Sequence, residues 1–423
     1  MSISVAIIGL GSRGLQTYAP CQNDFPDKLK IVAVADIIPE KVDIARRRYG
    51  IADEMCFGSG EELLERPKLA DAAFICTMDK QHYAHAKAAL EKGYDLLLEK
   101  PISPDADECR ELVEIAERFG RKVCVCHVLR YTPFYNELKR LLDEGAVGEV
   151  TSVQHIENVV YWHQAHSFVR GNWRNSNETS PMILQKCCHD MDLLVWLLGR
   201  RATKVQSFGG LYEFRPERAP KGSTERCVDC AVRADCPFDA EKIYLTNDAT
   251  GFLKGHKGWP CDVLSPEPTE RKLRDAIANG PYGRCVWRCD NDVVDHQVVN
   301  IEFEGGVTAQ LTMCAFTKRG GRDTVILGTK GQIIANLSEE LIHVLPFGGD
   351  NYDIDITKLA SGFGGHAGGD TRLVEEFIDI VGGGEPGIRT TTLADSTESH
   401  YIAFAAERSR VEGGRTVEMS EYR

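Results

Sequence analysis

A lysine follows directly after an apolar strand pattern in residues 94–101, YDLLLEKP. Proline cannot donate a hydrogen bond to a strand ladder, so Pro101 predicts that the strand ends at Glu99 and Lys100. Open parallel sheets bind their ligands at the carboxyl ends of their strands. Lys100 is therefore a candidate catalytic residue, because an amine at such an edge can exchange a proton with a bound hydroxyl group.

A second set of polar residues interrupts the apolar segment 182–198, MILQKCCHDMDLLVWLL, which predicts one long helix closed by Gly199. Lys186 and His189 share a face at i, i+3, and Gln185 adjoins that face at i, i+4 from His189. A lysine and a histidine are costly to bury unless they face a cavity or a partner. We therefore expect Lys186 and His189 to be catalytic and Gln185 to contact substrate. We interpret Asp192 as bracing the helix and Asp190 as a solvated or structural carboxylate.

Residues 161–175, YWHQAHSFVRGNWRN, place aromatic and cationic side chains just before that helix. Aromatic rings have apolar faces, and arginines form forked hydrogen bonds to carboxylates. The pattern predicts a substrate-binding segment, although a structured loop with core tryptophans would have the same composition. The candidate substrate contacts are Trp162, His163, Arg170, Trp173 and Arg174, with Tyr131 as a further residue facing the cleft.

The cysteines of residues 227–236, CVDCAVRADC, differ from those in apolar strands and helices. A C-x-x-C with two further cysteines can form a tetrahedral zinc site. The surrounding residues are polar, with Gly and Pro, so we expect no apolar core there and a benefit from a metal. Reduced thiols and an iron–sulfur cluster remain alternatives. The predicted zinc ligands are Cys227, Cys230, Cys236 and Cys261, with Cys285, Cys289 or His256 as replacements for Cys261.

The N-terminal part of the chain carries the elements that would position Lys100 and bind a cofactor. The β-branched run 3–8, ISVAII, predicts a buried strand, and the glycine motif GLGSRG follows it at 9–14. Glycines there permit a tight turn and close approach of a pyrophosphate to a helix N-terminus. A second strand, 29–35, ends in Asp36, placed to accept hydrogen bonds from the adenosine ribose. The predicted cofactor contacts in the loop are Gly9, Gly11, Ser12, Arg13 and Gly14.

The charge of Asp36 bears on the choice of cofactor. A carboxylate there repels a 2′-phosphate, which favours NAD over NADP. Arg13, in the same loop, could weaken that preference.

Strands at 72–77, 94–98 and 122–126 alternate with helices at 38–50, 81–92 and 104–119. Such alternation predicts a doubly wound parallel sheet, which we assign to residues 1–127. Later strands at 293–303, 307–313 and 323–329 have glycine turns between them and suit an antiparallel sheet. We assign residues 128–423 to this second α/β domain, with a cysteine-rich insertion at about 215–290.

The composition excludes several functional classes. The chain has 423 residues and a net charge of −13, without a basic run, so it is a poor candidate for binding nucleic acid or anionic membranes. No apolar run reaches the ~20 residues that span a bilayer, and the N-terminus shows no signal peptide. We expect a cytoplasmic protein whose cysteines stay reduced.

These motifs together resemble the Gfo/Idh/MocA oxidoreductases over essentially the whole chain. The resemblance rests on the glycine loop, Asp36, residues 76–82 (CTMDKQH), the EKP motif and residues 185–192. It implies a Rossmann domain followed by an α/β domain on a large open, mainly antiparallel sheet, and a homodimer or homotetramer. It also implies a bound nicotinamide cofactor and a sugar or polyol substrate, with Lys100 touching the reacting hydroxyl. Thr77, His82, Glu99 and Lys100 match the family's cofactor-side positions and are predicted cofactor contacts.

The chain departs from the family pattern at two places. Met78 and Asp79 replace a Pro-Asn pair, and Gln185 stands where the family has an aspartate four residues before His189. Glutamine can bind a hydroxyl but cannot stabilise an imidazolium as a carboxylate does. Lys186 could instead supply a cation for an anionic substrate group or a developing alkoxide.

Three hypotheses follow from this reading. The first is an NAD-dependent dehydrogenase that oxidises a ring hydroxyl of a sugar, with Lys100 and His189 as proton acceptors. The second is an enzyme that cleaves glycosides by oxidation, elimination, water addition and reduction, with NAD recycled in the site. The third is a cofactor-binding regulator without turnover, against which the intact Lys100 and His189 argue.

Overall fold

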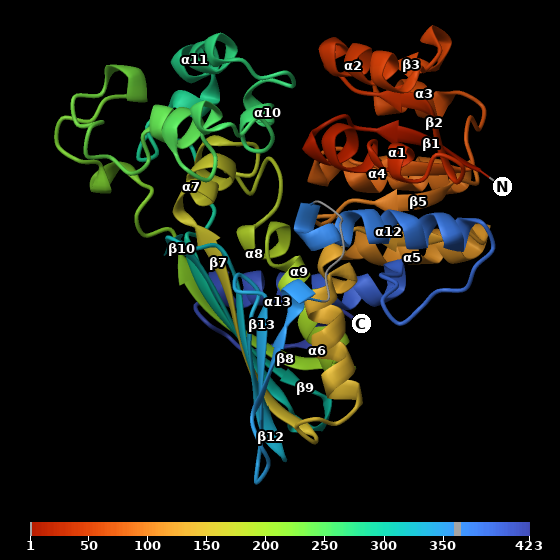
Figure 1. Cartoon of the computed structure of the whole chain (residues 1–423), viewed down its shortest axis with the longest axis vertical. Coiled ribbons are helices and arrows are strands. Elements are labelled where there is room, and N and C mark those ends of the chain that lie inside the picture. Colours follow the sequence, from red (N-terminus) through yellow and green to blue (C-terminus); the bar gives the residue numbers. More distant parts are fainter. Residues whose placement is uncertain (1, 359–364) are drawn as a thin grey trace.

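The computed structural model describes residues 2–358 and 365–423, with only the backbone for residues 365–367. Its strands form two sheets, stacked end to end along the long axis of the molecule (Figure 1). This architecture confirms the predicted fold class.

The first sheet is parallel, with the order β3-β2-β1-β4-β5-β6. Because the order reverses between β1 and β4, a crevice for a ligand is expected at the carboxyl ends of these two strands. The strands are β1 (Ile3–Ile8), β2 (Leu29–Ala35), β3 (Cys56–Phe57), β4 (Ala72–Ile75), β5 (Asp95–Leu98) and β6 (Val123–Val125). The helices between them are a π-helix (Ser12–Tyr18), α1 (Cys21–Asp24), α2 (Pro39–Tyr49), α3 (Gly60–Glu65), α4 (Asp79–Glu91) and α5 (Ala106–Phe119).

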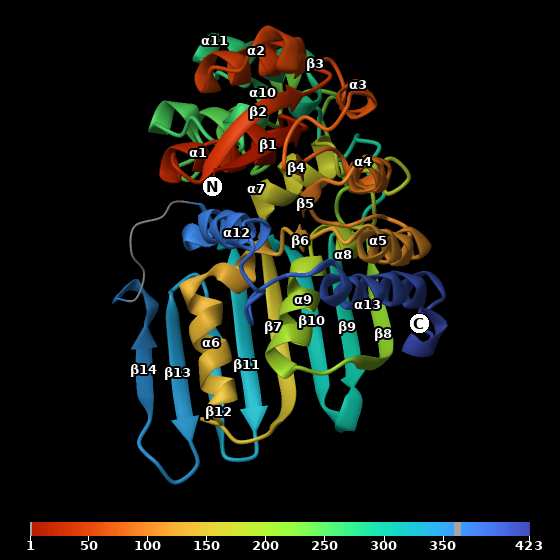
Figure 2. The same ribbon diagram turned by 90° about the vertical axis from the view of Figure 1, so that its right-hand side faces the viewer.

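The second sheet is mixed, with the order β14-β13-β12-β11-β7-β10-β9-β8-β15. Among the described strands, β7 and β10 pair in parallel and the other neighbours are antiparallel. Three helices, α6 (Pro133–Asp143), α9 (Cys188–Leu198) and α13 (Leu393–Val411), cover one face (Figure 2). The strands are β7 (Val150–Val160), β8 (Ala202–Gly210), β9 (His296–Phe303), β10 (Thr308–Thr317), β11 (Gly321–Gly328), β12 (Gly331–Asn336), β13 (Leu341–Pro346), β14 (Tyr352–Asp355) and β15 (Val417–Glu418).

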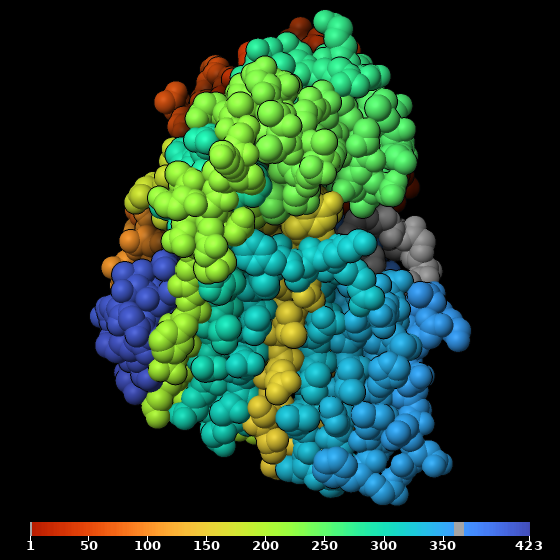
Figure 3. Space-filling model, turned by 90° about the vertical axis from the view of Figure 1, so that its left-hand side faces the viewer, coloured from red at the N-terminus to blue at the C-terminus, as the bar shows by residue number. Residues whose placement is uncertain are grey.

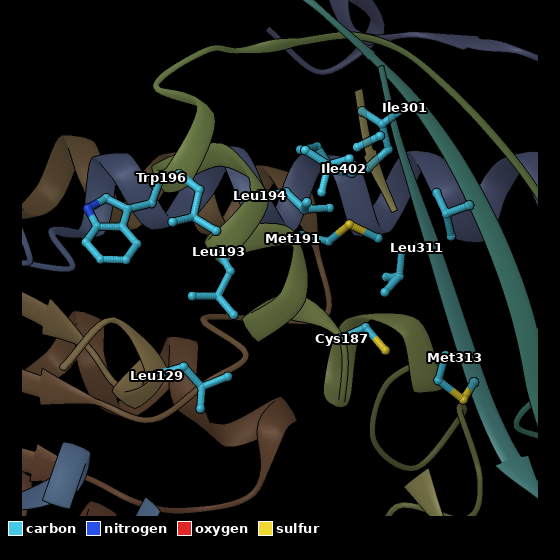
Figure 4. Packing of buried hydrophobic residues seen from close by; sticks show 14 of the residues in the cluster. Leu129, Cys187, Met191, Leu193, Leu194, Trp196, Ile301, Leu311, Met313 and Ile402 are labelled. Atoms are coloured by element: carbon cyan, nitrogen blue, oxygen red, sulfur yellow. The ribbon is translucent and has the colours of Figure 1, made fainter. Parts of the chain in front are cut away.

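Helix α9 packs its apolar side chains between this sheet and helix α13. Cys187 and Met191 point toward Leu311 and Met313 of β10, and Leu194 lies close to Ile402 of α13 (Figure 4). These side chains are almost fully buried. Packing of this kind fixes where His189 and its neighbours face, because buried positions tolerate little movement.

The single helix predicted for residues 182–198 is wrong. The structure has α8 (Met182–Gln185) and then α9, with a turn at Lys186 and Cys187. In an unbroken helix the Gln185 carbonyl would accept the His189 N–H. Here it accepts a hydrogen bond from Lys100 Nζ at 3.0 Å.

The chain returns to the first sheet after the second sheet is complete. Helix α12 (Gly365–Val381) packs Leu373, Val374 and Phe377 against Phe74 of β4, within one buried cluster. Helix α13 contacts α5 and β6 as well as the second sheet. The two sheets are thus joined by shared helices and not by a single linker.

The cysteine-rich insertion between β8 and β9 has its own apolar core. Its described helices include a π-helix (Lys242–Thr246), α10 (Cys261–Leu264) and α11 (Glu270–Asn279). The expectation that this segment cannot build a core is therefore wrong, because aromatic residues spread along it come together in space. The buried cluster includes Phe214, Phe238, Tyr244, Leu273, Tyr282 and Trp287.

The insertion also reaches the first sheet's helices across the crevice. Lys272 of α11 pairs with Glu40 of α2 at 3.4 Å, and Glu267 pairs with Arg48 of α2 at 3.8 Å. Both pairs are exposed, so each contributes little to stability. They show that the insertion and α2 approach one another, and Figure 1 shows α11 and α2 at the top of the molecule.

Candidate active site

The glycine loop has the geometry of a pyrophosphate cradle. A Cβ on Gly9, whose φ is +96°, would lie 2.5 Å from the Cys76 carbonyl oxygen, and a Cβ on Gly14 would lie 2.0 Å from the Gly9 oxygen. Both positions therefore require glycine for close packing. A Cβ on Gly11 would meet nothing within 4 Å. The open space lies where the Ser12 helix begins, so the loop fits a dinucleotide's pyrophosphate.

Asp36 lies beside this loop at the end of β2. Its carboxylate accepts hydrogen bonds from the backbone N–H groups of Leu10 at 2.6 Å and Ile38 at 2.8 Å. A carboxylate has about four lone-pair positions, so two remain for ribose hydroxyls. The nearest cation is Lys41, 4.0 Å away.

Arg13 does not lie near Asp36, contrary to the expectation that it could affect the cofactor's 2′ position. Its guanidinium turns inward and pairs with Glu99 at 2.5 Å and with Asp370 of α12 at 2.5 Å. Burial alone would raise the pKa of Glu99, but Arg13 and Lys100 outweigh it and hold that pKa below its ordinary value. Glu99 is thus an ionised anchor that joins the glycine loop to the EKP motif.

Thr77 and His82 brace the strand ends. The His82 ring bridges two backbone carbonyls, Pro101 O at 2.6 Å and Thr77 O at 3.0 Å. Because His82 is 1% exposed and both ring nitrogens are engaged, its role is to position β4 and the EKP motif. Contact of His82 with the cofactor stays a prediction, whereas Thr77 lies directly against the glycine loop.

Lys100 bridges the two halves of the molecule. It follows β5, and its ammonium donates to the Gln185 carbonyl at the break between α8 and α9. The side chain is partly exposed. The turn that carries Gln185, Lys186 and His189 is thereby held against the strand edge that bears the glycine loop.

His189 lies on the other side of this turn, partly exposed. Its ring packs edge-on against His127, with ring centres 5.5 Å apart. Burial, together with Arg130 and Lys100, lowers the pKa of His127 well below its ordinary value, so His127 is neutral. Asp192, one turn along α9, accepts both hydrogen bonds of the Arg130 fork at 2.6 and 2.7 Å and braces the helix.

Lys186 ends a chain of buried charges that the sequence did not reveal. Its ammonium pairs with Glu157 of β7 at 3.1 Å, and Glu157 pairs with Arg322 of β11 at 2.8 Å. Arg322 pairs in turn with Asp190 at 2.5 Å, which also contacts the His155 ring at 2.9 Å. The visible signal was a charged residue at each of two alternating, inward-facing strand positions, 157 and 322. These ion pairs hold Lys186 on the turn between Gln185 and His189.

Part of the aromatic segment 161–175 borders the same turn. Burial, with smaller contributions from the charges of Lys186 and Lys100, lowers the pKa of His163 well below its ordinary value, so His163 is neutral. His163 lies three residues beyond β7, whose Glu157 pairs with Lys186. Trp162 stacks beside His163 with ring centres 6.0 Å apart.

The other predicted substrate contacts lie elsewhere. Arg170 is 1% exposed and donates to the carbonyls of Arg284 and Phe238. Tyr131 lies fully buried in the core beneath α12. Each was predicted from its residue type, but each serves packing or buried hydrogen bonds.

Arg174 and Trp173 serve contacts within the fold. Arg174 pairs with Asp290 at 2.8 Å, so the prediction that it binds substrate is not supported. The Trp173 indole donates to Asp79 at 3.1 Å. Asp79 also accepts a hydrogen bond from Ser180 at 2.6 Å, so this first residue of α4 links the second half of the chain to the first.

The predicted zinc site is not supported. Cys227, Cys230, Cys236 and Cys285 line one small cavity, whereas the Cys261 thiol donates to the carbonyls of Tyr244 and Thr250. Within residues 2–358 and 365–423, no group of three His, Cys, Asp or Glu side chains is arranged to hold a metal ion.

Comparison with known proteins places the chain in a family. Residues 3–127 match the Gfo/Idh/MocA model for an oxidoreductase family with an NAD-binding Rossmann fold, and residues 139–419 match that family's C-terminal α/β domain. The chain therefore belongs to the Gfo/Idh/MocA family of NAD-binding oxidoreductases.

The individual relatives are distant. The putative oxidoreductase YteT of Bacillus subtilis is 23% identical over 414 residues, covering 91% of this chain and 92% of YteT. An inositol 2-dehydrogenase of Pseudomonas savastanoi is 27% identical over 73% of this chain and 87% of its own. An inositol dehydrogenase homologue from Azotobacter vinelandii, solved with NAD+, has a TM-score of 0.71 at 16% identity, covering 99% of this chain and 97% of its own. In the described part of the chain, no helix is long and apolar enough to cross a membrane.

Proposed function

We propose that this protein is an NAD-dependent oxidoreductase that oxidises a CH–OH group of a sugar or polyol. The observation that carries the proposal is the contact of Lys100 Nζ with the Gln185 carbonyl, 3.0 Å apart. It brings a lysine, the glycine cradle and the turn bearing Lys186 and His189 to one strand edge. The inositol 2-dehydrogenases among the relatives support a cyclic polyol or sugar as the substrate class.

The cofactor would lie along the carboxyl edge of the first sheet. Gly9, Gly11, Ser12 and Gly14 would hold the pyrophosphate and Asp36 the adenosine ribose, with Thr77 lining the edge. When bound, NAD supplies the hydride acceptor. The preference for NAD over NADP rests on the Asp36 charge, since Arg13 is turned away from it.

The choice of cofactor gives a first prediction. Asp36→Asn removes the charge that repels a 2′-phosphate and keeps one of two acceptor oxygens. We expect the NADP-to-NAD ratio of kcat/KM to rise about tenfold, which corresponds to ~1.4 kcal/mol. Asp43→Asn, on the exposed face of α2, is the matched control and should leave the ratio unchanged. An unchanged ratio in Asp36→Asn would contradict this role.

The chain's own groups handle the proton of the reacting hydroxyl. Lys100 is placed to accept it as the carbinol carbon is oxidised, and His189 offers a second acceptor across the turn. Lys186, held by Glu157, adds a fixed positive charge that stabilises a developing alkoxide or an anionic substrate group. The backbone carbonyl of Gln185 accepts a hydrogen bond from Lys100.

A second candidate function is cleavage of a glycoside with NAD recycled. The same proton acceptors would serve it, because both reactions begin by oxidising a hydroxyl. The balance of cofactor separates the two. A dehydrogenase accumulates NADH in proportion to product, whereas a cleaving enzyme releases aglycone with catalytic NAD and no net NADH. A regulator would bind NAD and show neither.

We also propose that the protein forms a homodimer or homotetramer through the face of the second sheet that the helices leave open. Figure 3 shows this face, with β7 as a yellow stripe below the green insertion. Sedimentation of the purified protein tests the assembly, and a monomer would contradict it. Exposed apolar side chains on the strands of the second sheet support this proposed assembly: Ile156, Phe208, Phe316 and Ile334.

A further inference from the structure

The cysteine-rich insertion places one large aromatic side chain beside the candidate active site. Trp259 is 37% exposed, although it belongs to an insertion whose other tryptophan, Trp287, is 6% exposed. Its ring lies 4.8 Å from His163 and 5.2 Å from Trp162, measured between ring centres. Residues 96 and 97 positions apart in sequence thus form one aromatic wall.

This wall is rigid because buried groups hold it from behind. Trp259 packs edge-on against His166, with ring centres 5.4 Å apart, and His166 is 1% exposed. The His166 ring contacts the Tyr244 hydroxyl at 2.8 Å and stacks on Tyr282 at 4.9 Å. An aromatic ring fixed in this way presents its open surface without the entropy cost of ordering it on binding.

The wall lies next to the strand that holds Lys186. His163 follows β7 by three residues, Glu157 of β7 pairs with Lys186 at 3.1 Å, and Trp259 packs against the His163 ring. The ion pair of Lys272 with Glu40 shows that the insertion lies beside α2, which follows the strand ending at Asp36. A sugar ring undergoing oxidation at Lys100 would fill the space next to His163. The Trp259 ring would then lie beside whatever is attached to that sugar.

We propose that Trp259, with Trp162, is a specificity-determining platform for a second ring, so that the substrate is a glycoside or disaccharide and not a free monosaccharide. This inference rests on the proposed function and names its substrate class. Apolar aromatic faces paired with a few polar groups are typical of sites for amphipathic ligands such as sugars. The oxidised ring meets the lysines and His189, and the second ring stacks on Trp259.

The test compares one-ring and two-ring substrates in the full-length protein with NAD. Free monosaccharides and their phenyl glycosides and disaccharides are assayed with wild type and with Trp259→Ala. We expect the KM for the two-ring substrates to rise about 5- to 10-fold and the KM for the monosaccharide to stay within about twofold. Trp259→Phe keeps an aromatic face and should restore most of the difference. Leu253→Ala, also exposed in the insertion, should change neither KM.

Equal changes for both substrate classes, or none for either, would overturn the platform. Thermal unfolding and NAD binding of each variant show whether the insertion remains folded, and Trp259→Phe decides the matter if Trp259→Ala does not fold. If wild type oxidises simple sugars but the Trp259 variants treat both classes alike, only the platform fails. If wild type turns over no sugar or glycoside at all, the proposed function itself fails.

Discussion

Replacing Lys100 with methionine is expected to lower kcat by about 10²- to 10⁴-fold, the usual contribution of a positioned acid or base. Methionine keeps an unbranched apolar stem but cannot exchange a proton or donate to the Gln185 carbonyl. The glycine cradle and Asp36 do not depend on Lys100, so the Kd for NAD should change by less than about threefold. Steady-state rates and a binding titration with NAD measure the two quantities separately.

The matched control is Lys92→Met, which replaces an exposed lysine just after α4, in the same domain. It should leave both kcat and the Kd for NAD unchanged. If Lys100→Met kept full turnover, Lys100 would not be the proton acceptor. If it lost NAD binding in parallel with turnover, its role would be to hold the cofactor cleft together.

Arg322→Leu has the largest expected effect on stability. Arg322 is 7% exposed and pairs with two carboxylates, Glu157 and Asp190, that are 2% and 0% exposed. Removing one partner of a buried ion pair leaves uncompensated charge, and such changes lower the free energy of unfolding by about 3–5 kcal/mol. Urea denaturation followed by circular dichroism measures the loss.

The matched control is Arg319→Leu, an arginine three positions away whose partner Glu339 is half exposed. Exposed pairs contribute ~0–1 kcal/mol, so this variant should unfold almost as wild type does. Equal stability of the two variants would contradict the buried network.

The same network predicts a dependence on pH. Burial alone raises the pKa of Asp190, but Arg322 and His155 outweigh it and hold the pKa below its ordinary value. A carboxylate with a depressed pKa stabilises the fold above its unfolded pKa, and that contribution is lost as the pH falls through the folded pKa. Wild type should therefore lose stability as the pH falls, and its advantage over Arg322→Leu in urea denaturation should shrink, because protonation of Asp190 removes the ion pair in wild type and relieves the unpaired buried charge in the variant.

Local pattern predicted those parts of the fold and site that depend on nearby residues. The glycine loop, Asp36 and the strand ending at Lys100 are each set by a few adjacent residues, and the strand–helix alternation specified the parallel sheet. Parts that depend on distant partners could not be predicted. At the break after Gln185, the carbonyl that the helix would use accepts a hydrogen bond from Lys100, 85 residues earlier, and no local pattern indicates this partner.

Residue type alone does not predict which partner a buried side chain meets. Arg13 and Arg170 were expected to meet ligands, but each finds buried acceptors brought by segments far away in sequence. The Cys-x-x-Cys motif suggested a metal, whereas aromatic residues spread over the insertion form a core. Trp259 carries no local motif, and only its packing against His163 indicates a role.

The most direct test of the central claim is a single-turnover experiment with enzyme in excess over NAD. A sugar, polyol or glycoside that the enzyme converts is mixed with the enzyme–NAD complex, and the absorbance of reduced nicotinamide is followed. Oxidation of a CH–OH group predicts that reduced nicotinamide appears in wild type and fails to appear on the same time scale in Lys100→Met. Conversion of the substrate without any reduced nicotinamide, in a protein that binds NAD, would contradict it.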